Sequence, residues 1–280
     1  MFQIYDTRTG RVADVSSGPG GLLRLYARPP APQRPLVLGE LRTLLVADLI
    51  RRNAEHRHGL TVVASLVMPD AGNDGGAAGP GGAPDAAATA LNIKPAEQTS
   101  GRPELTASAV GDVEPGEIVI EALPGPAARA AVQYSVRVAG AHGAPEVPLS
   151  ALAGSGLDPL AARLALLSFR HAEQAALGWD VLAEADRALR RWREHVAEWA
   201  ESPSKPMCAE VTAQVAAAFD DDLDTPAALR ALRGLDNDPQ IPPGSKFESF
   251  LHADQLLGLD LPRDIGRPRY GPGAAAPAAQ

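Results

Sequence analysis

Two short apolar runs enclose a helical pattern between residues 22 and 67, and this arrangement restricts the fold more than any other feature. The runs are Leu22–Tyr26 and Leu60–Val67, and a helix is predicted between them over Gly39–Asn53. A strand, a helix and a second buried strand form the repeating unit of a parallel Rossmann-like sheet. The N-terminus of such a helix favours phosphate. The sequence therefore predicts an α/β domain that begins near the start of the chain.

Residues 69–90 contain Gly, Pro, Ala and Asp without periodicity, which predicts a flexible linker. Beyond this linker, Glu117–Leu123 and Ala131–Val138 are predicted as two further strands, separated by turns rich in Gly and Pro. No cofactor motif occurs between residues 91 and 156. Residues 1–68 and 91–156 are therefore interpreted together as a reduced Rossmann-like domain.

The pattern changes to helices after residue 157. Asp158 and Pro159 supply an N-cap and a proline at the first helical position. The clearest helix is predicted over Asp180–Ala200, because apolar residues recur there at helical spacing and form one stripe. The residues of this stripe are Leu182, Ala185, Leu189, Trp192, Val196 and Trp199.

Three further helices are predicted toward the C-terminal end. One covers Cys208–Phe219, and Thr225-Pro226 is predicted to cap the next. Ser245 with Glu248 is predicted to form a capping box for a last helix that ends at Gly258. Residues 157–262 are therefore interpreted as a bundle of about five helices, followed by a disordered tail over residues 263–280.

The charge balance of the chain argues against extensive contact with nucleic acid. The sequence has 26 basic and 34 acidic residues, a net charge of −8 and a pI near 5.3. Proteins that grip a long phosphate backbone usually carry a basic face, so tRNA binding is not expected. The single Cys208 excludes an internal disulfide, and no secretory signal or membrane-spanning run is present. We expect a soluble, cytoplasmic protein.

Several segments carry a resemblance to a known family. The most specific is Asp220–Leu229 (DDDLDTPAAL), and the others are Leu157–Ser168, Trp179–Leu182, Arg190–Arg193, Lys246–Leu261, Ile4–Val12 and Ala90–Pro95. In order and spacing they resemble bacterial cysteinyl-tRNA synthetases and their close relative, the cysteine ligase of mycothiol biosynthesis. The resemblance covers roughly residues 1–68, 88–98 and 150–263. It implies a class I synthetase-type α/β domain with a helical domain after it.

The chemistry that this resemblance implies is the activation of cysteine with ATP. In that family zinc recognises the thiolate, and the motifs HIGH and KMSKS stabilise charge on the phosphates. This chain has Arg28 in place of the first zinc cysteine and Val37–Glu40 (VLGE) in place of HIGH. No lysine occurs between Lys94 and Lys205, where KMSKS would lie. The chain is therefore interpreted as a truncated, degenerate paralogue that is catalytically inactive and lacks zinc.

Gly39, Arg42 and Thr43 remain from the nucleotide signature and are predicted to form a vestigial nucleotide site. The leading hypothesis is a non-catalytic protein that binds or regulates a protein partner through the helical bundle. A second hypothesis is an ATP-dependent aminoacyl ligase with an altered site, in which Arg28, Arg34 and Arg42 converge on one pocket and neutralise the phosphates. A third is a drifting gene product without function.

Four other features have both a chemical and a structural interpretation, and the structural one is favoured for each. His142 can touch a phosphate but is expected to lie on the solvated surface. Cys208 can be a reactive thiol but is expected to be inert. Asp220-Asp221-Asp222 can suggest a metal but is expected to form a structural turn. The three tryptophans are predicted to anchor the core or the contacts between helices: Trp179, Trp192 and Trp199.

Overall fold

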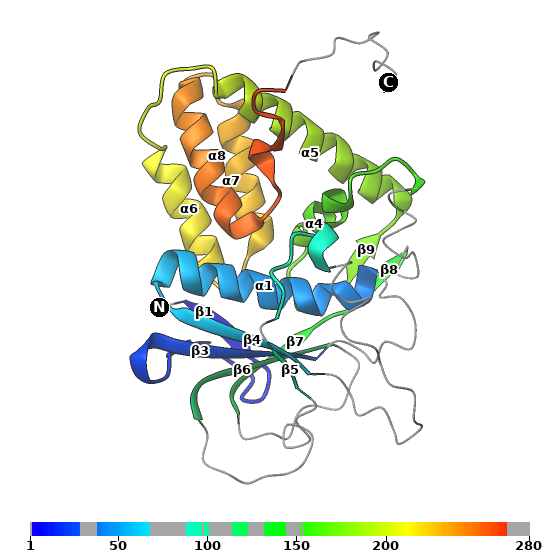
Figure 1. Ribbon diagram of the computed structural model, residues 1–280, viewed down its shortest axis with the longest axis vertical. Coiled ribbons are helices and arrows are strands. Elements are labelled where there is room, and N and C mark those ends of the chain that lie inside the picture. The colour runs from blue at the N-terminus through cyan, green and yellow to red at the C-terminus, as the bar shows by residue number, and fades with distance from the viewer. Residues whose placement is uncertain are drawn as a thin grey trace, which may run out of the picture.

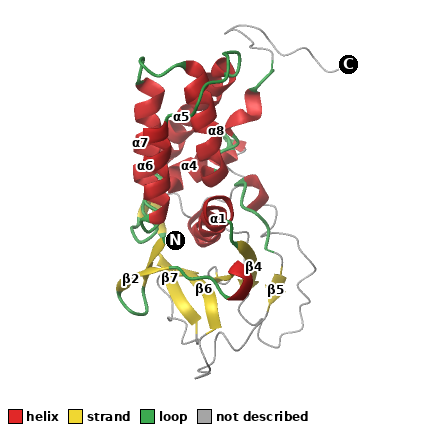
Figure 2. Cartoon of the chain, turned by 90° about the vertical axis from the view of Figure 1, so that its left-hand side faces the viewer, coloured by secondary structure: helices red, strands yellow, loops and turns green. Residues whose placement is uncertain are grey.

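The structure, a computed structural model, has two layers that Figures 1 and 2 show from two directions. A sheet forms one layer, and every labelled helix lies on the same side of it. The residues that the structure describes are 2–28, 38–67, 88–96, 98–100, 114–122, 132–143, 152 and 154–267. The predicted linker falls mostly outside them, as do residues 268–280 of the predicted tail, whereas Arg263 and Asp264 lie in a short 3₁₀ helix.

The main sheet has five parallel strands in the order β5-β4-β3-β6-β7. The strands are β3 (Leu22–Arg28), β4 (Thr61–Val67), β5 (Gln98–Ser100), β6 (Glu114–Ala122) and β7 (Val132–Val138). If these five strands are renumbered 1 to 5 along the chain, their order in the sheet is 3-2-1-4-5. Doubly wound Rossmann-like sheets have this order around their first strand. The four predicted strands and their parallel α/β arrangement are confirmed, and β5 was missed.

Helix α1 (Leu38–His58) lies between the sheet and the remaining helices, as Figure 2 shows end-on. It is longer than the predicted Gly39–Asn53, and its last turn carries His56, Arg57 and His58, which suit the negative end of a helix dipole. Residues 41–50 are buried on every side of the helix. A helix that is covered all round has no solvent-facing polar side, which explains why α1 shows no single apolar stripe, and its polar residues Arg42 and Asp48 are buried as well.

Two short pairings of strands were not predicted. The hairpin of β1 (Gln3–Asp6) and β2 (Arg11–Asp14) is antiparallel and precedes the 3₁₀ helix η1 (Pro19–Gly21). Strand β8 (Ala141–Gly143) pairs in parallel with β9 (Ala175–Leu177). Strands of three or four residues are too short to show a periodic pattern in a sequence, so pairing reveals them only in three dimensions.

The second half of the chain is helical, as expected. Its elements are α4 (Pro159–Leu167), α5 (Trp179–Trp199), α6 (Ala209–Asp220), α7 (Thr225–Asn237), α8 (Pro243–Leu257) and the 3₁₀ helix η3 (Leu261–Asp264). The carboxylate of Asp158 accepts a hydrogen bond from the amide of Leu160, as its predicted N-cap role requires. Every residue of the predicted apolar stripe on α5 is buried. Gly258 ends α8 with a φ of 64°, which glycine adopts without strain.

Two predicted helix starts are wrong. The cap of α7 is Asp224, whose carboxylate accepts from the amide of Ala227, whereas Thr225 is already helical. Helix α8 begins at Pro243, so Ser245 lies inside it and cannot form a capping box. Glu248 instead accepts a hydrogen bond from the hydroxyl of Ser204 at 2.7 Å.

A single hydrophobic core runs through both halves of the described chain. It joins Leu25 of β3 and Ile120 of β6 to Leu164 of α4 and Phe250 of α8, with residues of α1 between them. The predicted boundary near residue 156 is therefore crossed by continuous packing. No helix among the described residues is long and apolar enough to cross a membrane.

Candidate functional site

The fold places a candidate site where β3 and β6 meet. These strands are adjacent although α1 and β4 separate them in the chain, so the order in which strands are added to the parallel sheet reverses here. In sheets of this kind ligands lie beyond the carboxyl ends of the strands at this point. Arg28 ends β3, and Glu121 is its partner in register near the end of β6. Their side chains form an ion pair with 2.6 Å between Nη1 and Oε1. Arg137 of β7 is in register with Glu121 on its other side.

The residues at this site do not fit zinc. A guanidinium cannot ligate a metal, and Arg28 stands where the first zinc cysteine would be. The single Cys208 is the N-cap of α6, in the helical half. The described residues contain no cluster of three or more His, Cys, Asp or Glu side chains arranged to hold a metal ion. That this protein binds no zinc stays a prediction.

Arg42, a residue of the predicted nucleotide site, is buried and bound to the backbone. Its guanidinium donates to the carbonyl oxygens of Ala139 at 2.8 Å, Gly140 at 3.1 Å, Arg170 at 2.6 Å and Glu173 at 2.5 Å. Burial lowers the pKa of Arg42 to about 10, which leaves the group charged at neutral pH. The side chain therefore ties α1 to the end of β7 and to the segment before β9.

The other residues of the predicted nucleotide site lie in the first turns of α1. Gly39 is half-buried, and Thr43 is buried with its hydroxyl lacking a hydrogen-bond partner among the described residues. Arg34 and Val37 fall outside the described residues. The vestigial site of Gly39, Arg42 and Thr43 thus stays a prediction.

The aspartate run before α7 forms a turn that holds four parts of the chain together. Asp220 accepts from Arg57 at 2.6 Å and contacts His58 at 2.9 Å, both at the end of α1. Asp222 accepts from the amide of Tyr5 in β1 at 2.7 Å and contacts His171 at 3.0 Å. Asp222 has a φ of 51°, so the turn is left-handed there. These contacts support the structural interpretation of the run over the metal one.

Comparison with known proteins gives partial matches. No protein-family model matches the chain. An L-cysteine:1D-myo-inositol 2-amino-2-deoxy-α-D-glucopyranoside ligase from Mycolicibacterium smegmatis is 40% identical over 119 residues, which are 41% of this chain and 28% of that protein. The ligase of the same name from Rhodococcus erythropolis is 36% identical over 121 residues, 40% of this chain and 27% of that protein. The chain is a partial relative of these cysteine ligases.

The match confirms the resemblance inferred from the motifs. A third ligase of this name, from Streptomyces griseus, is 42% identical over 84 residues, which are 30% of this chain and 20% of that protein. The chain thus spans less than a third of the length of each of these curated relatives. The names of these relatives describe the relatives themselves, and their activity is not thereby shown for this chain.

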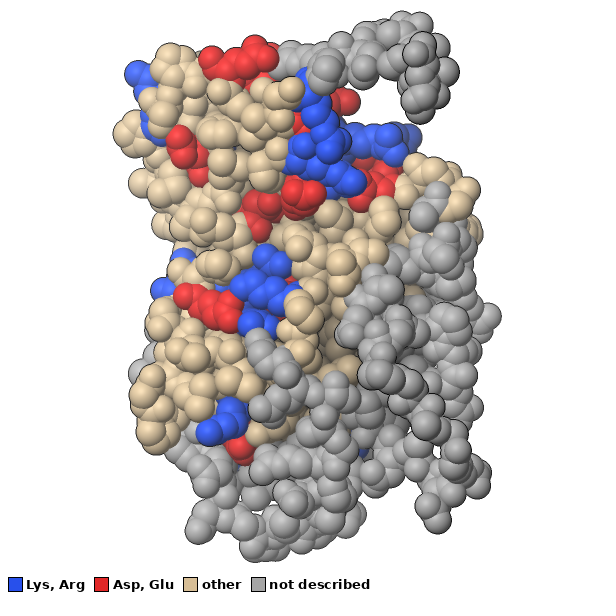
Figure 3. All heavy atoms as spheres, in the orientation of Figure 1, with Lys and Arg blue, Asp and Glu red and all other residues tan. Residues whose placement is uncertain are grey.

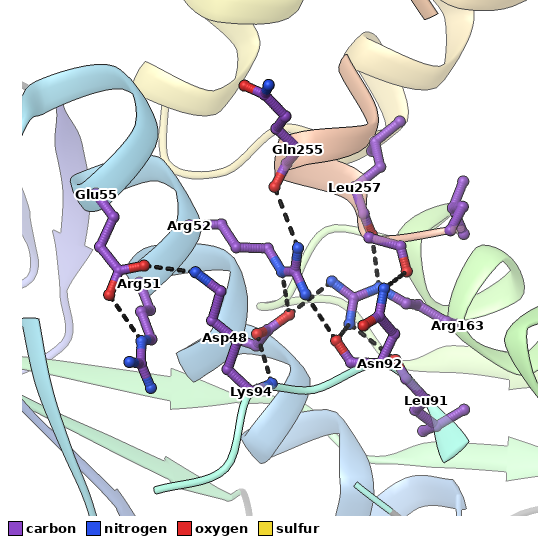
Figure 4. Close-up of polar contacts among 12 residues, drawn as sticks. Asp48, Arg51, Arg52, Glu55, Leu91, Asn92, Lys94, Arg163, Gln255 and Leu257 are labelled. Carbon is purple, nitrogen blue, oxygen red and sulfur yellow. Dashed lines mark hydrogen bonds and ion pairs between the residues drawn. The ribbon is translucent and has the colours of Figure 1, made fainter. Parts of the chain in front are cut away.

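Segments that resemble the cysteine ligases meet in one buried network, drawn in Figure 4. Asp48 of α1 accepts from Arg163 of α4 at 2.7 Å and from Arg52 at 2.8 Å. Arg163 also donates to the carbonyl oxygens of Leu257 at 2.6 Å and Leu91 at 2.9 Å. Burial alone would raise the pKa of Asp48, but the two guanidiniums, that of Arg163 first, hold it below its usual value. The network joins α1, α4 and α8 to the segment before β5.

Neither this network nor the Arg28–Glu121 pair was predicted from the sequence. A signal was present in both cases: a charged residue inside an apolar run is seldom buried without a partner. Arg163 interrupts Leu160–Leu167, and Glu121 follows Ile118–Ile120. The sequence could not show which opposite charge each of them meets.

The remaining candidates occupy ordinary structural positions. His142 is exposed on β8, as expected, although on a strand rather than in a turn. Cys208 is half-buried, and its amide donates to Ser249 at 2.9 Å. Trp192 and Trp199 pack edge-on against Phe250, as predicted. Trp179 is 48% exposed, so its assignment to the core was wrong.

Proposed function

We propose that this partial relative of the cysteine ligases is non-catalytic and acts by binding another protein. The observation that carries the proposal is the Arg28–Glu121 ion pair at the point where the sheet order reverses. A neutralised pair offers neither a soft metal site for a thiolate nor free positive charge for a phosphate. At the edge of the sheet where a ligand is expected, the Arg28–Glu121 ion pair thus joins β3 to β6.

The residues that resemble the cysteine ligases have structural contacts, which supports the same proposal. Arg42 is bound to four carbonyl oxygens. Asp48 and Arg163 form a buried ion pair, and Asp220 and Asp222 hold the turn between α6 and α7. Packing rather than chemistry explains why such residues are present.

The names of the relatives favour a second candidate, an ATP-dependent ligase with an altered site. It would need Arg28, Arg34 and Arg42 on one pocket. The guanidiniums of Arg28 and Arg42 already have partners, and Arg34 lies outside the described residues. A ligase of this kind would therefore have to break the Arg28–Glu121 pair when ATP binds.

Calorimetric titration with a non-hydrolysable cysteinyl-adenylate analogue, with ATP titrated in parallel, separates the two candidates. The non-catalytic proposal expects no saturable heat at millimolar ligand. Saturable binding at micromolar concentration would contradict it. The same titrations are repeated with the variant Glu121→Gln, in which Arg28 no longer has its charged partner. Binding that appears only in this variant would support a pocket that the ion pair closes.

A further inference from the structure

Helices α4, α5 and α7 enclose a groove on the surface of the helical half. Half-buried Phe169 and Val181 lie along its apolar lining, and three exposed arginines line it as well. Arg187 and Arg191 come from α5, and Arg233 comes from α7. We call this feature the arginine groove. It combines apolar surface with positive charge from two different helices.

The arginines of this groove lack strong partners. The side chains of Arg187 and Arg233 make no hydrogen bond or ion pair with any described residue. Arg191 has its nearest carboxylate, that of Asp236, at 3.8 Å. Asp236 also contacts His195 at 2.6 Å, so its charge is shared. Glu184 is the one carboxylate in the described lining of the groove.

Two exposed arginines of this acidic chain that lie outside the arginine groove are paired. Arg190 lies 2.7 Å from Asp186, and Arg263 lies 2.8 Å from Asp158. On the face that Figure 3 shows, blue and red side chains accordingly lie next to one another. Arg187 and Arg233 thus bring positive charge into the arginine groove that no described carboxylate neutralises, in a chain whose net charge is −8.

We propose that the arginine groove binds an acidic, amphipathic helix of a partner protein. The proposal rests on the proposed function, in which the helical half makes the contact. Arg187 and Arg191 are one helical turn apart on α5, which suits carboxylates one turn apart on a partner helix. Arginine binds carboxylates through two parallel hydrogen bonds, and the apolar lining receives the apolar face of the same helix.

The charge of the whole chain favours a short acidic helix over a nucleic acid. A long phosphate backbone would meet the net charge of −8 beyond the groove, whereas a short helix contacts only the local positive surface. The aspartates and glutamates outside the groove therefore limit the occupant to a short segment. Binding should weaken as salt is added, because the arginines are exposed.

The test uses the full chain and a fluorescent peptide of about 18 residues, long enough to form a helix. As a helix, this peptide carries glutamates on one face, to meet the arginines, and leucines beside them, to meet the apolar lining of the groove. A scrambled peptide of the same composition is the control. Fluorescence anisotropy measures binding by the native chain and by the Arg187→Glu/Arg233→Glu variant. The matched control is Arg230→Glu, an exposed arginine of α7 that is absent from the arginine groove and lines a separate groove between α6 and α7. Far-UV circular dichroism checks that each variant is folded.

We expect the native chain to prefer the helical peptide to the scrambled one. The double variant should bind it about tenfold or more weakly, and Arg230→Glu should bind it within about twofold of the native chain. Equal loss in both variants, or absence of peptide binding by the native chain, would overturn the proposal. A single-stranded RNA of equal charge that binds as tightly as the peptide would also overturn it. The adenylate titration on the same preparations decides the non-catalytic proposal separately, whatever the peptide does.

Discussion

Arg42 and Arg163 are both fully enclosed cations, and the chain satisfies them in different ways. Arg163 faces a carboxylate, Asp48, together with backbone carbonyl oxygens. Arg42 faces carbonyl oxygens, and no described carboxylate lies within ion-pair distance of it. Burial lowers the pKa of both guanidiniums. Each holds segments that are far apart in the sequence, so both act on stability.

Replacing Arg42 with methionine should destabilise the protein by roughly 3 to 5 kcal/mol, because carbonyl groups that it satisfies would lose their donor inside the protein. Urea unfolding measures the effect. Arg230→Met, which removes an exposed arginine, is the matched control and should change stability by less than about 0.5 kcal/mol. If Arg42→Met unfolds like the native chain, the guanidinium does not hold the backbone and is free to serve the predicted nucleotide site.

Replacing Asp48 with asparagine should lower the free energy of unfolding by roughly 3 kcal/mol at neutral pH, because Arg163 would stay buried without an opposite charge beside it. The folded-state pKa of Asp48 is below the unfolded value of 3.8. Its contribution is therefore fully present above pH 3.8 and is lost as the pH falls through the folded pKa. The difference between the native chain and Asp48→Asn should shrink over that acidic range.

Urea unfolding of both proteins at neutral and acidic pH tests this dependence. Burial raises the pKa of Asp254, which works in the opposite direction, but Asp254 is present in both proteins and largely cancels from the difference. Asp264→Asn, at a more exposed pair with Arg267, is the control. A difference that stays constant into the acidic range would show that the charge of Asp48 is not what stabilises the network.

At the scale of elements, α1 is the helix on which both layers pack. It contacts β3, β4 and β6 of the sheet and α4, α6 and α8 of the helical half. The aspartate turn fixes the end of α1 through Asp220 and starts α7 through Asp224. Short polar turns thus set the positions of long helices.

The cap of α7 gives a test at this scale. Asp224→Ala should lower stability by about 1 to 2 kcal/mol, because the first turn of α7 loses an acceptor and Arg170 loses a partner. Glu248→Ala, which a capping box at α8 would make equally costly, should change stability by less than about 0.5 kcal/mol, because Glu248 meets an exposed serine. Thermal unfolding of the two variants compares them. If Glu248→Ala lost more stability than Asp224→Ala, the result would support the predicted capping box at α8 instead.

At the scale of the whole molecule, the shared core predicts that both halves unfold together. The three tryptophans lie on α5, so their fluorescence reports the helical half alone, whereas far-UV circular dichroism reports the sheet as well. We expect the two signals to change at the same urea concentration. A fluorescence transition at clearly higher urea would show that the helical half is an independent domain.

Periodicity determined much of the architecture without the structure. The apolar run Ile118–Ile120 in β6, the alternation along β7, the stripe on α5 and the Asp158 cap are local signals, because neighbouring residues alone produce them. Strands β5, β8 and β9 had no such signal, since each is too short. The start of α8 was misplaced because serine and glutamate at capping spacing also occur inside helices and at surface contacts.

The sequence by itself determined that an α/β unit precedes a helical half and that the resemblance is to cysteine ligases, and it predicted that Arg28 and Val37–Glu40 stand in place of a zinc cysteine and the HIGH motif. It did so because these properties depend on residue identity and local spacing. Only the tertiary structure decided that Arg28 meets Glu121, that Arg42 meets the backbone and that Asp48 meets Arg163. These partners lie far apart along the chain, and the energy of a buried charge depends on the group that folding places beside it.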